Sequence, residues 1–184
     1  ILNSRIWYTS SVSYISDSCI AGQCILCRDN NLRSANPITM QKIVPHLWFD
    51  TQAKEAANFY ASVFPDASVT NVTTITGTPS GDCDVVSFDI MGFSFQSISA
   101  GPYFKLNPSV SFMVNFDPSQ NSEARKQIDE VWEKLSADGK VLMPLGAYPF
   151  SEHYGWVEDK YGVSWQLIYT KPEGEVRPRI IPSI

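Results

Sequence analysis

A repeated segment constrains the fold of this chain more than any other feature. Residues 92–98 read Gly-Phe-Ser-Phe-Gln-Ser-Ile and residues 162–168 read Gly-Val-Ser-Trp-Gln-Leu-Ile, so Gly, Ser, Gln and Ile recur in the same places. The pair Phe-Asp stands at 49–50 and again at 116–117, each time before an expected helix. Because both matches keep their order along the chain, we interpret the sequence as two copies of one supersecondary unit.

The first copy covers about residues 40–100 and predicts the order strand, helix, strand, strand, strand. An apolar run at 43–49 is typical of a buried strand, and Asp50 and Thr51 form an N-cap signal for the following helix. Three strand-like stretches follow at 68–75, 84–90 and 93–99. The apolar face expected for the helix consists of Ala53, Ala56, Ala57, Tyr60 and Phe64.

The second copy covers about residues 108–171 and repeats this order. A strand is expected at 110–116, and a helix is expected to begin at Asp117 and Pro118 and to close at Gly139. Its apolar face consists of Ala124, Ile128, Val131, Trp132 and Leu135. Three more strands are expected at 140–145, 153–158 and 163–169. The sequence therefore predicts an α+β domain of paired βαβββ modules at 40–171.

The two ends of the chain differ from this domain in composition and in hydrophobic periodicity. Residues 1–39 are rich in Ser and Asn and show no sustained periodicity, so we interpret them as a leader that is either non-native or extended. Patterned sequence opens at Met40. Residues 172–184 contain three prolines, which predicts an extended tail that packs on a neighbour or stays free.

Charge and hydropathy exclude two broad classes of function. The chain has 184 residues with a formal net charge of −5, so it lacks the global basic surface of a nucleic-acid-wrapping protein. No apolar run approaches the roughly 20 residues that a membrane-spanning helix needs. We therefore expect neither a nucleic-acid partner nor a membrane.

The cysteines are concentrated near the start of the chain. Cys19, Cys24 and Cys27 stand close together, whereas Cys83 is alone. A secreted disulfide scaffold spreads its cysteines through the chain, so we expect a reduced, cytoplasmic protein. The three clustered cysteines have the spacing of plant-type two-iron ferredoxins, but such a cluster needs a fourth thiolate. We interpret the spacing as a coincidence or a fragment and leave the role of these cysteines open.

Several segments resemble a known family. They are 44–50 (VPHLWFD), 55–60 (EAANFY), 111–115 (SFMVN) and 154–166 (YGWVEDKYGVSWQ), the last being the most specific. They resemble the vicinal-oxygen-chelate superfamily of glyoxalases, bleomycin-resistance proteins and extradiol dioxygenases. Within it they are similar to the PhnB-like branch, often labelled 3-demethylubiquinone-9 3-methyltransferase-like. The resemblance implies two half-open cups that enclose a site, and a homodimer.

The resemblance also implies where a metal would bind. Metal-using members place ligands, commonly two His and two Glu, on the first and last strands of each module. Carried over to this chain, the last-strand positions are Gln96 and Gln166, and His46 lies near the first-strand position. A neutral amide oxygen brings no charge to offset the lost hydration of a divalent cation. We therefore expect no tight metal or other cofactor, and keep His46, Gln96 and Gln166 as a weak alternative set.

The same positions point to binding of a small molecule. Two glutamines related by the repeat can both donate and accept hydrogen bonds to a planar polar ligand. Strand alternation turns Phe95 and Trp165 away from them, into the helix-facing core. Trp48 shares the face of His46 and can belong either to the pocket or to the core. The predicted ligand-binding residues are His46, Trp48, Gln96, Ser111, Trp156 and Gln166.

Other chemistry finds little support in the sequence. His153 is interpreted as a solvated rim residue, because alternation turns Glu152 to the opposite face. Asp159 is expected to cap the turn before Gly162. No nucleophile elbow is present, and no glycine-rich strand-to-helix loop is present for an adenosyl cofactor.

The leading functional hypothesis is a small-molecule-binding protein without a tight metal, and sequestration of a toxic compound is one version of it. The alternative is an enzyme: a metal-dependent lyase, isomerase or dioxygenase of the glyoxalase type, or one that uses His46 as a general base. A purely structural or partner-binding module is a third hypothesis. The sequence names neither the ligand nor a catalytic residue.

Overall fold

The computed structural model describes residues 43–171 and 176–184. The expectations for residues 1–39, including those for Cys19, Cys24 and Cys27, lie outside this part of the chain. None of the helices in the described part has both the length and the apolar character required to cross a membrane.

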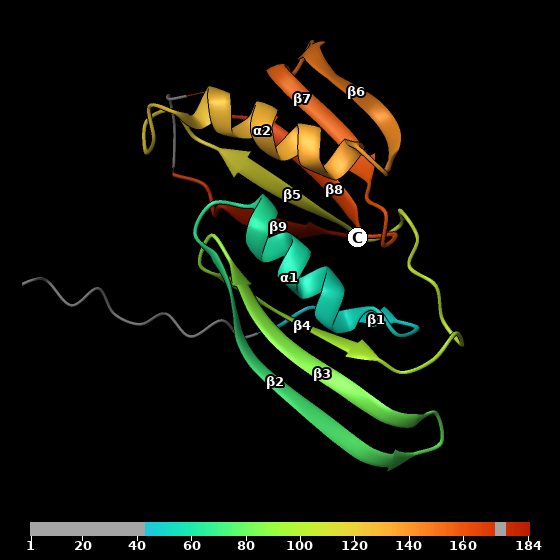
Figure 1. Cartoon of the computed structure of the whole chain (residues 1–184). Coiled ribbons are helices and arrows are strands. Elements are labelled where there is room, and N and C mark those ends of the chain that lie inside the picture. Colours follow the sequence, from blue (N-terminus) through green and yellow to red (C-terminus); the bar gives the residue numbers. More distant parts are fainter. Residues whose placement is uncertain (1–42, 172–175) are drawn as a thin grey trace, which may run out of the picture. The chain divides into compact units, whose positions relative to one another are not determined.

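The strands of the described residues form two mixed sheets (Figure 1). The first sheet has the order β1-β4-β3-β2 and consists of β1 (His46–Phe49), β2 (Ala67–Thr78), β3 (Gly81–Ile90) and β4 (Phe93–Ser99). The second sheet has the order β6-β7-β8-β5-β9 and consists of β5 (Ser111–Phe116), β6 (Lys140–Tyr148), β7 (Ser151–Glu158), β8 (Ser164–Tyr169) and β9 (Ile180–Ser183).

Strand pairing confirms the duplication. The parallel pair β1–β4 has its counterpart in the parallel pair β5–β8, and antiparallel strands complete both sheets in the same order. His46 lies opposite Gln96 in the first copy, and Met113 lies opposite Gln166 in the second. Met113 is therefore the counterpart of His46. The predicted α+β fold of paired βαβββ modules is confirmed.

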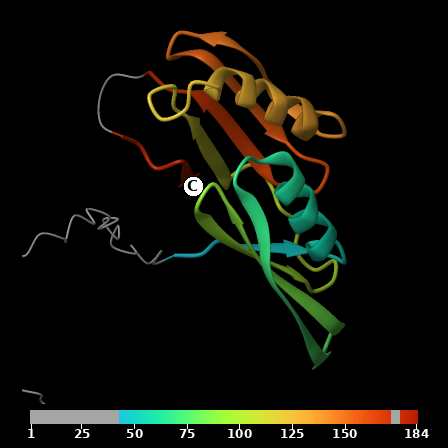
Figure 2. The ribbon, with the colours of Figure 1, turned by 60° about the vertical axis from the view of Figure 1, so that its left-hand side comes forward.

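Each half carries one helix across one face of its sheet, as the two views show (Figures 1 and 2). Helix α1 (Ala53–Val63) packs on the first sheet and helix α2 (Ala124–Ser136) on the second. The predicted N-cap of α1 is wrong, because Gln52 occupies that position. The Ala53 N–H instead donates to the Ser99 hydroxyl of β4 at 3.0 Å, which ties the helix start to the sheet.

The predicted start of α2 is also wrong. Asp117 Oδ1 accepts hydrogen bonds from the Ser119 N–H at 2.8 Å and from the Ser119 hydroxyl at 2.6 Å. This local turn satisfies groups that a helix would otherwise use, so the helix begins only at Ala124. The same bonds from Ser119 hold the pKa of the Asp117 carboxyl below its ordinary value.

The helix-facing sides of both halves share one core centred on Trp165. The Trp165 ring lies 4.8 Å from the Phe64 ring and 5.4 Å from the Tyr60 ring, both of the first half. Phe95 of β4 contacts Phe112 of β5 at 5.0 Å between ring centroids. The prediction that Phe95 and Trp165 belong to the core is confirmed, since they are 1% and 0% exposed.

Strand β9 is an element that the sequence did not predict. It pairs antiparallel with β5, so Val114 lies opposite Ile180 and Ser111 opposite Ser183. Pro182 is tolerated there because β9 is the edge strand of its sheet. Part of the proline-containing tail is therefore fixed to the domain.

The turn between β7 and β8 is organised by Asp159. Its Oδ1 accepts hydrogen bonds from the N–H groups of Tyr161 at 2.8 Å and Val163 at 3.0 Å, which confirms the predicted capping role. Its Oδ2 accepts from the Trp165 Nε1–H at 2.8 Å and from the Tyr60 hydroxyl at 2.9 Å. One buried carboxylate thus connects the turn to the core and to helix α1.

Candidate functional site

Strand alternation divides each sheet into a core face and an outer face, the outer face being the one opposite the helix. Phe95 and Trp165 lie on the core faces of β4 and β8. Their neighbours Gln96 and Gln166 therefore point to the outer faces. The two glutamines occupy equivalent positions in the repeat, but their surroundings differ.

In the second half, Gln166 belongs to a row of hydrogen-bonded side chains on three adjacent strands. The Tyr154 hydroxyl of β7 donates to Gln166 Oε1 at 2.7 Å. Gln166 Nε2 donates to the Ser111 hydroxyl of β5 at 2.8 Å. Burial raises the pKa of the Tyr154 phenol above its ordinary value, and the nearby Tyr148 adds to this shift. Tyr154 is therefore a neutral donor at neutral pH, which fixes the orientation of the Gln166 amide.

Aromatic and apolar side chains flank this polar row. Trp156 is half-buried on the same face as Tyr154, and its Nε1–H donates to the Ser164 hydroxyl at 2.8 Å, which holds the indole in place. Met113 is half-buried opposite Gln166. Sequence reasoning predicted Trp156 but missed Tyr154 and Met113 as site residues. Tyr154 and Met113 lie two residues from Trp156 and Ser111 on the same strands. Strand alternation therefore places all four side chains on one face, which the sequence could have indicated.

In the first half, the corresponding side chains are free. His46 and Gln96 lie side by side in the parallel β1–β4 pair and both are exposed. Within the described residues neither side chain makes a hydrogen bond to another group. Trp48 is half-buried, its Nε1–H donates to the Gly101 carbonyl at 2.9 Å, and its ring meets Phe104 edge-on at 5.1 Å. Trp48 therefore packs on the loop after β4.

His46 also lines an apolar cavity between the two halves. The cavity has a volume of about 350 Å³, and its wall includes Phe112, Ser164 and Pro182 from the second half. Neither Gln96 nor Gln166 lines it. The structure thus brings Ser111, Gln166, Tyr154 and Trp156 onto one face, and it places His46 with Gln96 on another.

The donor set at the predicted metal positions does not fit a divalent cation. His46 stands beside a neutral amide, and its counterpart in the repeat is the thioether of Met113. In residues 43–171 and 176–184 no group of three His, Cys, Asp or Glu side chains is placed to hold a metal ion. Hard cations bind through carboxylates and borderline ones through several imidazoles or thiolates, and one imidazole with two amides supplies neither set.

The interpretation of His153 as a solvated residue is wrong. His153 is only 8% exposed and faces helix α2, where its Nε2 lies 2.6 Å from Asp129 Oδ1. The pair could not be predicted from the sequence, because Asp129 lies on the face of the helix that was expected to face solvent. The Asp129 side chain is 53% exposed, yet it still reaches the buried His153 ring. The pair connects α2 to β7, away from the outer face.

A comparison with family models matches most of the chain that the structure describes. The family model described as 3-demethylubiquinone-9 3-methyltransferase matches residues 41–168, which cover nearly all of both modules and include the row of Tyr154, Gln166 and Ser111. The chain belongs to this family. It is PhnB-like, because a PhnB protein that it covers over the whole length is 36% identical to it. A comparison with curated proteins found no match.

Solved structures of PhnB-like and glyoxalase-like proteins have the same architecture. The PhnB protein from Bacillus cereus is 36% identical, with a TM-score of 0.62 over 71% of this chain and 100% of that chain. Protein PA1353 from Pseudomonas aeruginosa is 18% identical, with a TM-score of 0.56 over 71% and 98%. A glyoxylase/bleomycin resistance protein/dioxygenase domain from Frankia sp. EAN1pec is 11% identical, with a TM-score of 0.50 over 72% and 94%. The last two show the fold alone.

Proposed function

We propose that this PhnB-like protein binds a small planar polar or aromatic molecule on the outer face of its second half. The observation that carries the proposal is the hydrogen-bonded row Tyr154–Gln166–Ser111. Both ends of the Gln166 amide are held by protein groups, so its direction is set before a ligand arrives. A preorganised amide loses less conformational entropy on binding than a free one.

The row keeps unused hydrogen-bonding capacity for a ligand. The Gln166 NH₂ has a second hydrogen and its carbonyl oxygen a second lone pair. The Ser111 hydroxyl hydrogen is not used by the bond from Gln166. A planar molecule with an adjacent donor and acceptor matches this arrangement, and the fixed indole of Trp156 offers it an aromatic contact.

His46, Trp48 and Gln96 stay predicted ligand contacts from the first half. His46 and Gln96 share an exposed outer-face position, but neither side chain is hydrogen-bonded to another of the described residues. They must therefore be ordered when a ligand binds, and we expect them to contribute less than Gln166. Sequestration requires only such a binding surface and no reacting group.

The test is a binding screen followed by two matched variants. Purified protein is screened by saturation-transfer NMR against nicotinamide, quinoxaline and metal-free bleomycin. Bleomycin is included because the Frankia domain of the same fold is named a glyoxylase/bleomycin resistance protein/dioxygenase domain. Affinities of the hits are measured for the wild type, Gln166→Leu and Gln96→Leu. The two substitutions are chemically identical and fall at equivalent positions of the repeat.

We expect Gln166→Leu to weaken binding by about tenfold, which corresponds to 1.4 kcal/mol and the loss of one or two hydrogen bonds. Gln96→Leu is expected to weaken it by about threefold or less, since its side chain has to be ordered first. If Gln166→Leu left the affinity of every hit unchanged, the outer face of the second half would not be the binding site. Equal losses in both variants would contradict the argument from preorganisation.

A further inference from the structure

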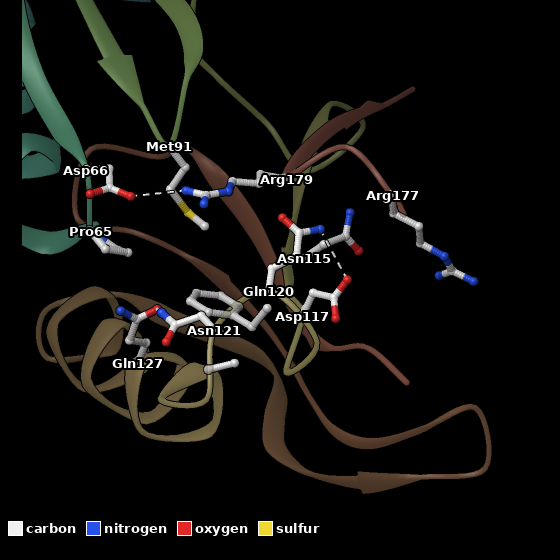
Figure 3. Close-up of a pocket in the computed structure, with 12 residues that line it drawn as sticks. Pro65, Asp66, Met91, Asn115, Asp117, Gln120, Asn121, Gln127, Arg177 and Arg179 are labelled. Carbon is white, nitrogen blue, oxygen red and sulfur yellow. Dashed lines mark hydrogen bonds and ion pairs between the residues drawn. The ribbon is translucent and has the colours of Figure 1, made fainter. Parts of the chain in front are cut away.

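A second, separate cavity lies where the first half meets the connection between β5 and α2. Its volume is about 170 Å³, and its wall includes Asp66 and Met91 from the first half, Asn115 from β5, and Arg177 and Arg179 from the segment before β9 (Figure 3). None of the residues proposed above to bind the planar ligand lines this cavity. Its lining comes from three separate parts of the chain.

Asn115 presents an unsatisfied acceptor in this cavity. The residue is only 4% exposed, and its Nδ2 donates to the Pro178 carbonyl at 2.6 Å. Because a carbonyl oxygen can only accept, the amide cannot be flipped without losing this bond. Its Oδ1 is buried and accepts no hydrogen bond from any of the described residues. Such an atom costs about 1–3 kcal/mol unless a donor reaches it.

Of the two arginines that line the cavity, one has an ion-pair partner within the part of the chain that the structure describes and the other has none there. Arg179 Nη1 lies 3.1 Å from Asp66 Oδ2, and the Asp117 carboxylate accepts bonds from Ser119 and Gln120. Arg177 extends its guanidinium away from the other side chains (Figure 3) and makes no ion pair within the described residues. Its exposed side chain is free to turn toward a bound anion.

The wall of the cavity also contains strained backbone. Asp66 and Met91 have φ angles of 49° and 51°, in the left-handed region that residues with a Cβ rarely adopt. The Met91 N–H donates to the Asp66 carbonyl at 3.0 Å, so the two strained residues support each other. Strain of this kind costs about 1–3 kcal/mol per residue and is concentrated at functional sites.

We infer that this cavity binds a small zwitterion, of the class of a free α-amino acid with a small side chain. The ammonium group donates to Asn115 Oδ1, and the carboxylate pairs with Arg177. Among the described residues that line the cavity, these are a buried acceptor and a cation for which no partner is found. A water molecule takes about 30 Å³ of liquid, so the cavity has room for roughly five or six heavy atoms. Glycine and alanine, with five and six heavy atoms, match this size, whereas an aromatic amino acid does not.

The experiment is a titration of ¹⁵N-labelled full-length protein with glycine, followed in ¹H–¹⁵N spectra that include the Asn side-chain amides. Ethanolamine and acetate, which carry only one of the two charges, are titrated in parallel. The variants are Asn115→Ala, Arg177→Gln and, as a matched loss of one positive charge on the outer side of α2, Lys126→Gln. Gln166→Leu is included because it separates this site from the proposed planar-ligand site.

We expect saturable shifts at the Asn115 amide with a dissociation constant of about 1 mM or lower for glycine. Arg177→Gln should weaken binding by about fivefold or more, and Asn115→Ala should abolish it, whereas Lys126→Gln and Gln166→Leu should leave it unchanged. Arg177 is exposed, so its variant keeps the test valid even if Asn115→Ala does not fold. No saturable shift with glycine would mean that the cavity holds water only. Equal binding of ethanolamine or acetate, or an equal effect of Lys126→Gln, would also overturn the inference.

Discussion

The Tyr60 hydroxyl donates a hydrogen bond of 2.9 Å to Asp159 Oδ2, and this bond joins helix α1 of the first half to a turn of the second. Both residues are buried, at 0% and 4% exposure. Burial raises the pKa of Tyr60 well above its ordinary value, and the adjacent Asp159 adds to this shift. Tyr60 therefore stays a neutral donor, and the bond holds the two copies of the duplicated unit together.

Removing the Tyr60 hydroxyl should destabilise the protein. Tyr60→Phe deletes a buried hydrogen bond to a carboxylate, so we expect the free energy of unfolding to fall by about 1.5–3 kcal/mol. The measurement is urea unfolding followed by tryptophan fluorescence. The control is Tyr161→Phe, whose hydroxyl bonds to the exposed Glu55 and should cost about 0.5 kcal/mol or less. Similar losses of unfolding free energy in both variants would show that the buried Tyr60–Asp159 bond stabilises the protein no more than the exposed Tyr161–Glu55 bond.

The stability contributed by Asp159 should depend on pH. Burial raises the pKa of the Asp159 carboxyl above its ordinary value of 3.8, although the bonds from Trp165, Tyr60, Val163 and Tyr161 oppose the shift. Between the unfolded and folded pKa values the folded state binds more protons, so this contribution is present below the unfolded pKa and is lost as pH rises through the folded pKa.

The direction of this pH dependence can be measured by comparison with Asp159→Asn, which has no titrating carboxyl at position 159. The difference in unfolding free energy between wild type and Asp159→Asn should shrink as the pH rises through the range above 3.8. The measurement is urea unfolding of both proteins at a series of pH values. A difference that grows with pH would mean that the folded pKa lies below the unfolded one.

Gly155 should be intolerant of any side chain. A Cβ at this position of β7 would lie 2.5 Å from the Trp132 ring of α2, closer than such atoms can approach. We expect Gly155→Ala to lower the free energy of unfolding by about 1–3 kcal/mol, because helix and strand must move apart. Gly146→Ala in β6 is the matched control, since no atom lies within 4 Å of its Cβ position. Adding Trp132→Leu to Gly155→Ala should recover part of the loss, and no recovery would contradict the mechanism.

Strand β9 should contribute to the stability of the domain. Ile180 is 2% exposed and lies opposite Val114 of β5. We expect Ile180→Ala to cost about 2–4 kcal/mol by leaving a cavity, measured by thermal or urea unfolding. Ile184→Ala, one residue beyond β9 and fully exposed, should change the stability by no more than about 0.5 kcal/mol. Equal, small effects at both positions would mean that β9 does not hold its place in solution.

The expected homodimer is tested by mass in solution. Val72 and Ile75 of the edge strand β2 are 42% and 47% exposed, so this strand offers apolar surface to a second copy. Light scattering after size exclusion should give twice the 20.6 kDa of one chain. A mass of one chain at every concentration tested would contradict the prediction.

The sequence alone determined the duplicated βαβββ plan, because hydrophobic periodicity and the repeated Gly-x-Ser-x-Gln-x-Ile segment depend only on local spacing. The same local rule placed Phe95 and Trp165 in the core and turned Gln96 and Gln166 to the outer faces. The helix starts were predicted less well, because the hydrogen bonds of Ser99 and Ser119 decide them and short motifs do not encode which of these bonds form.

Only the tertiary structure decided how equivalent residues came to differ. Gln166 is held by Tyr154 and Ser111, which are distant in sequence, whereas Gln96 has no such partners in the described part of the chain. The pairing of β9 with β5, the burial of His153 against Asp129 and the unsatisfied Asn115 oxygen likewise follow from which segments meet in space. The alternation of side chains along a strand predicts which face of the sheet a residue occupies. The residue that it contacts on that face is set by how the strands and helices pack.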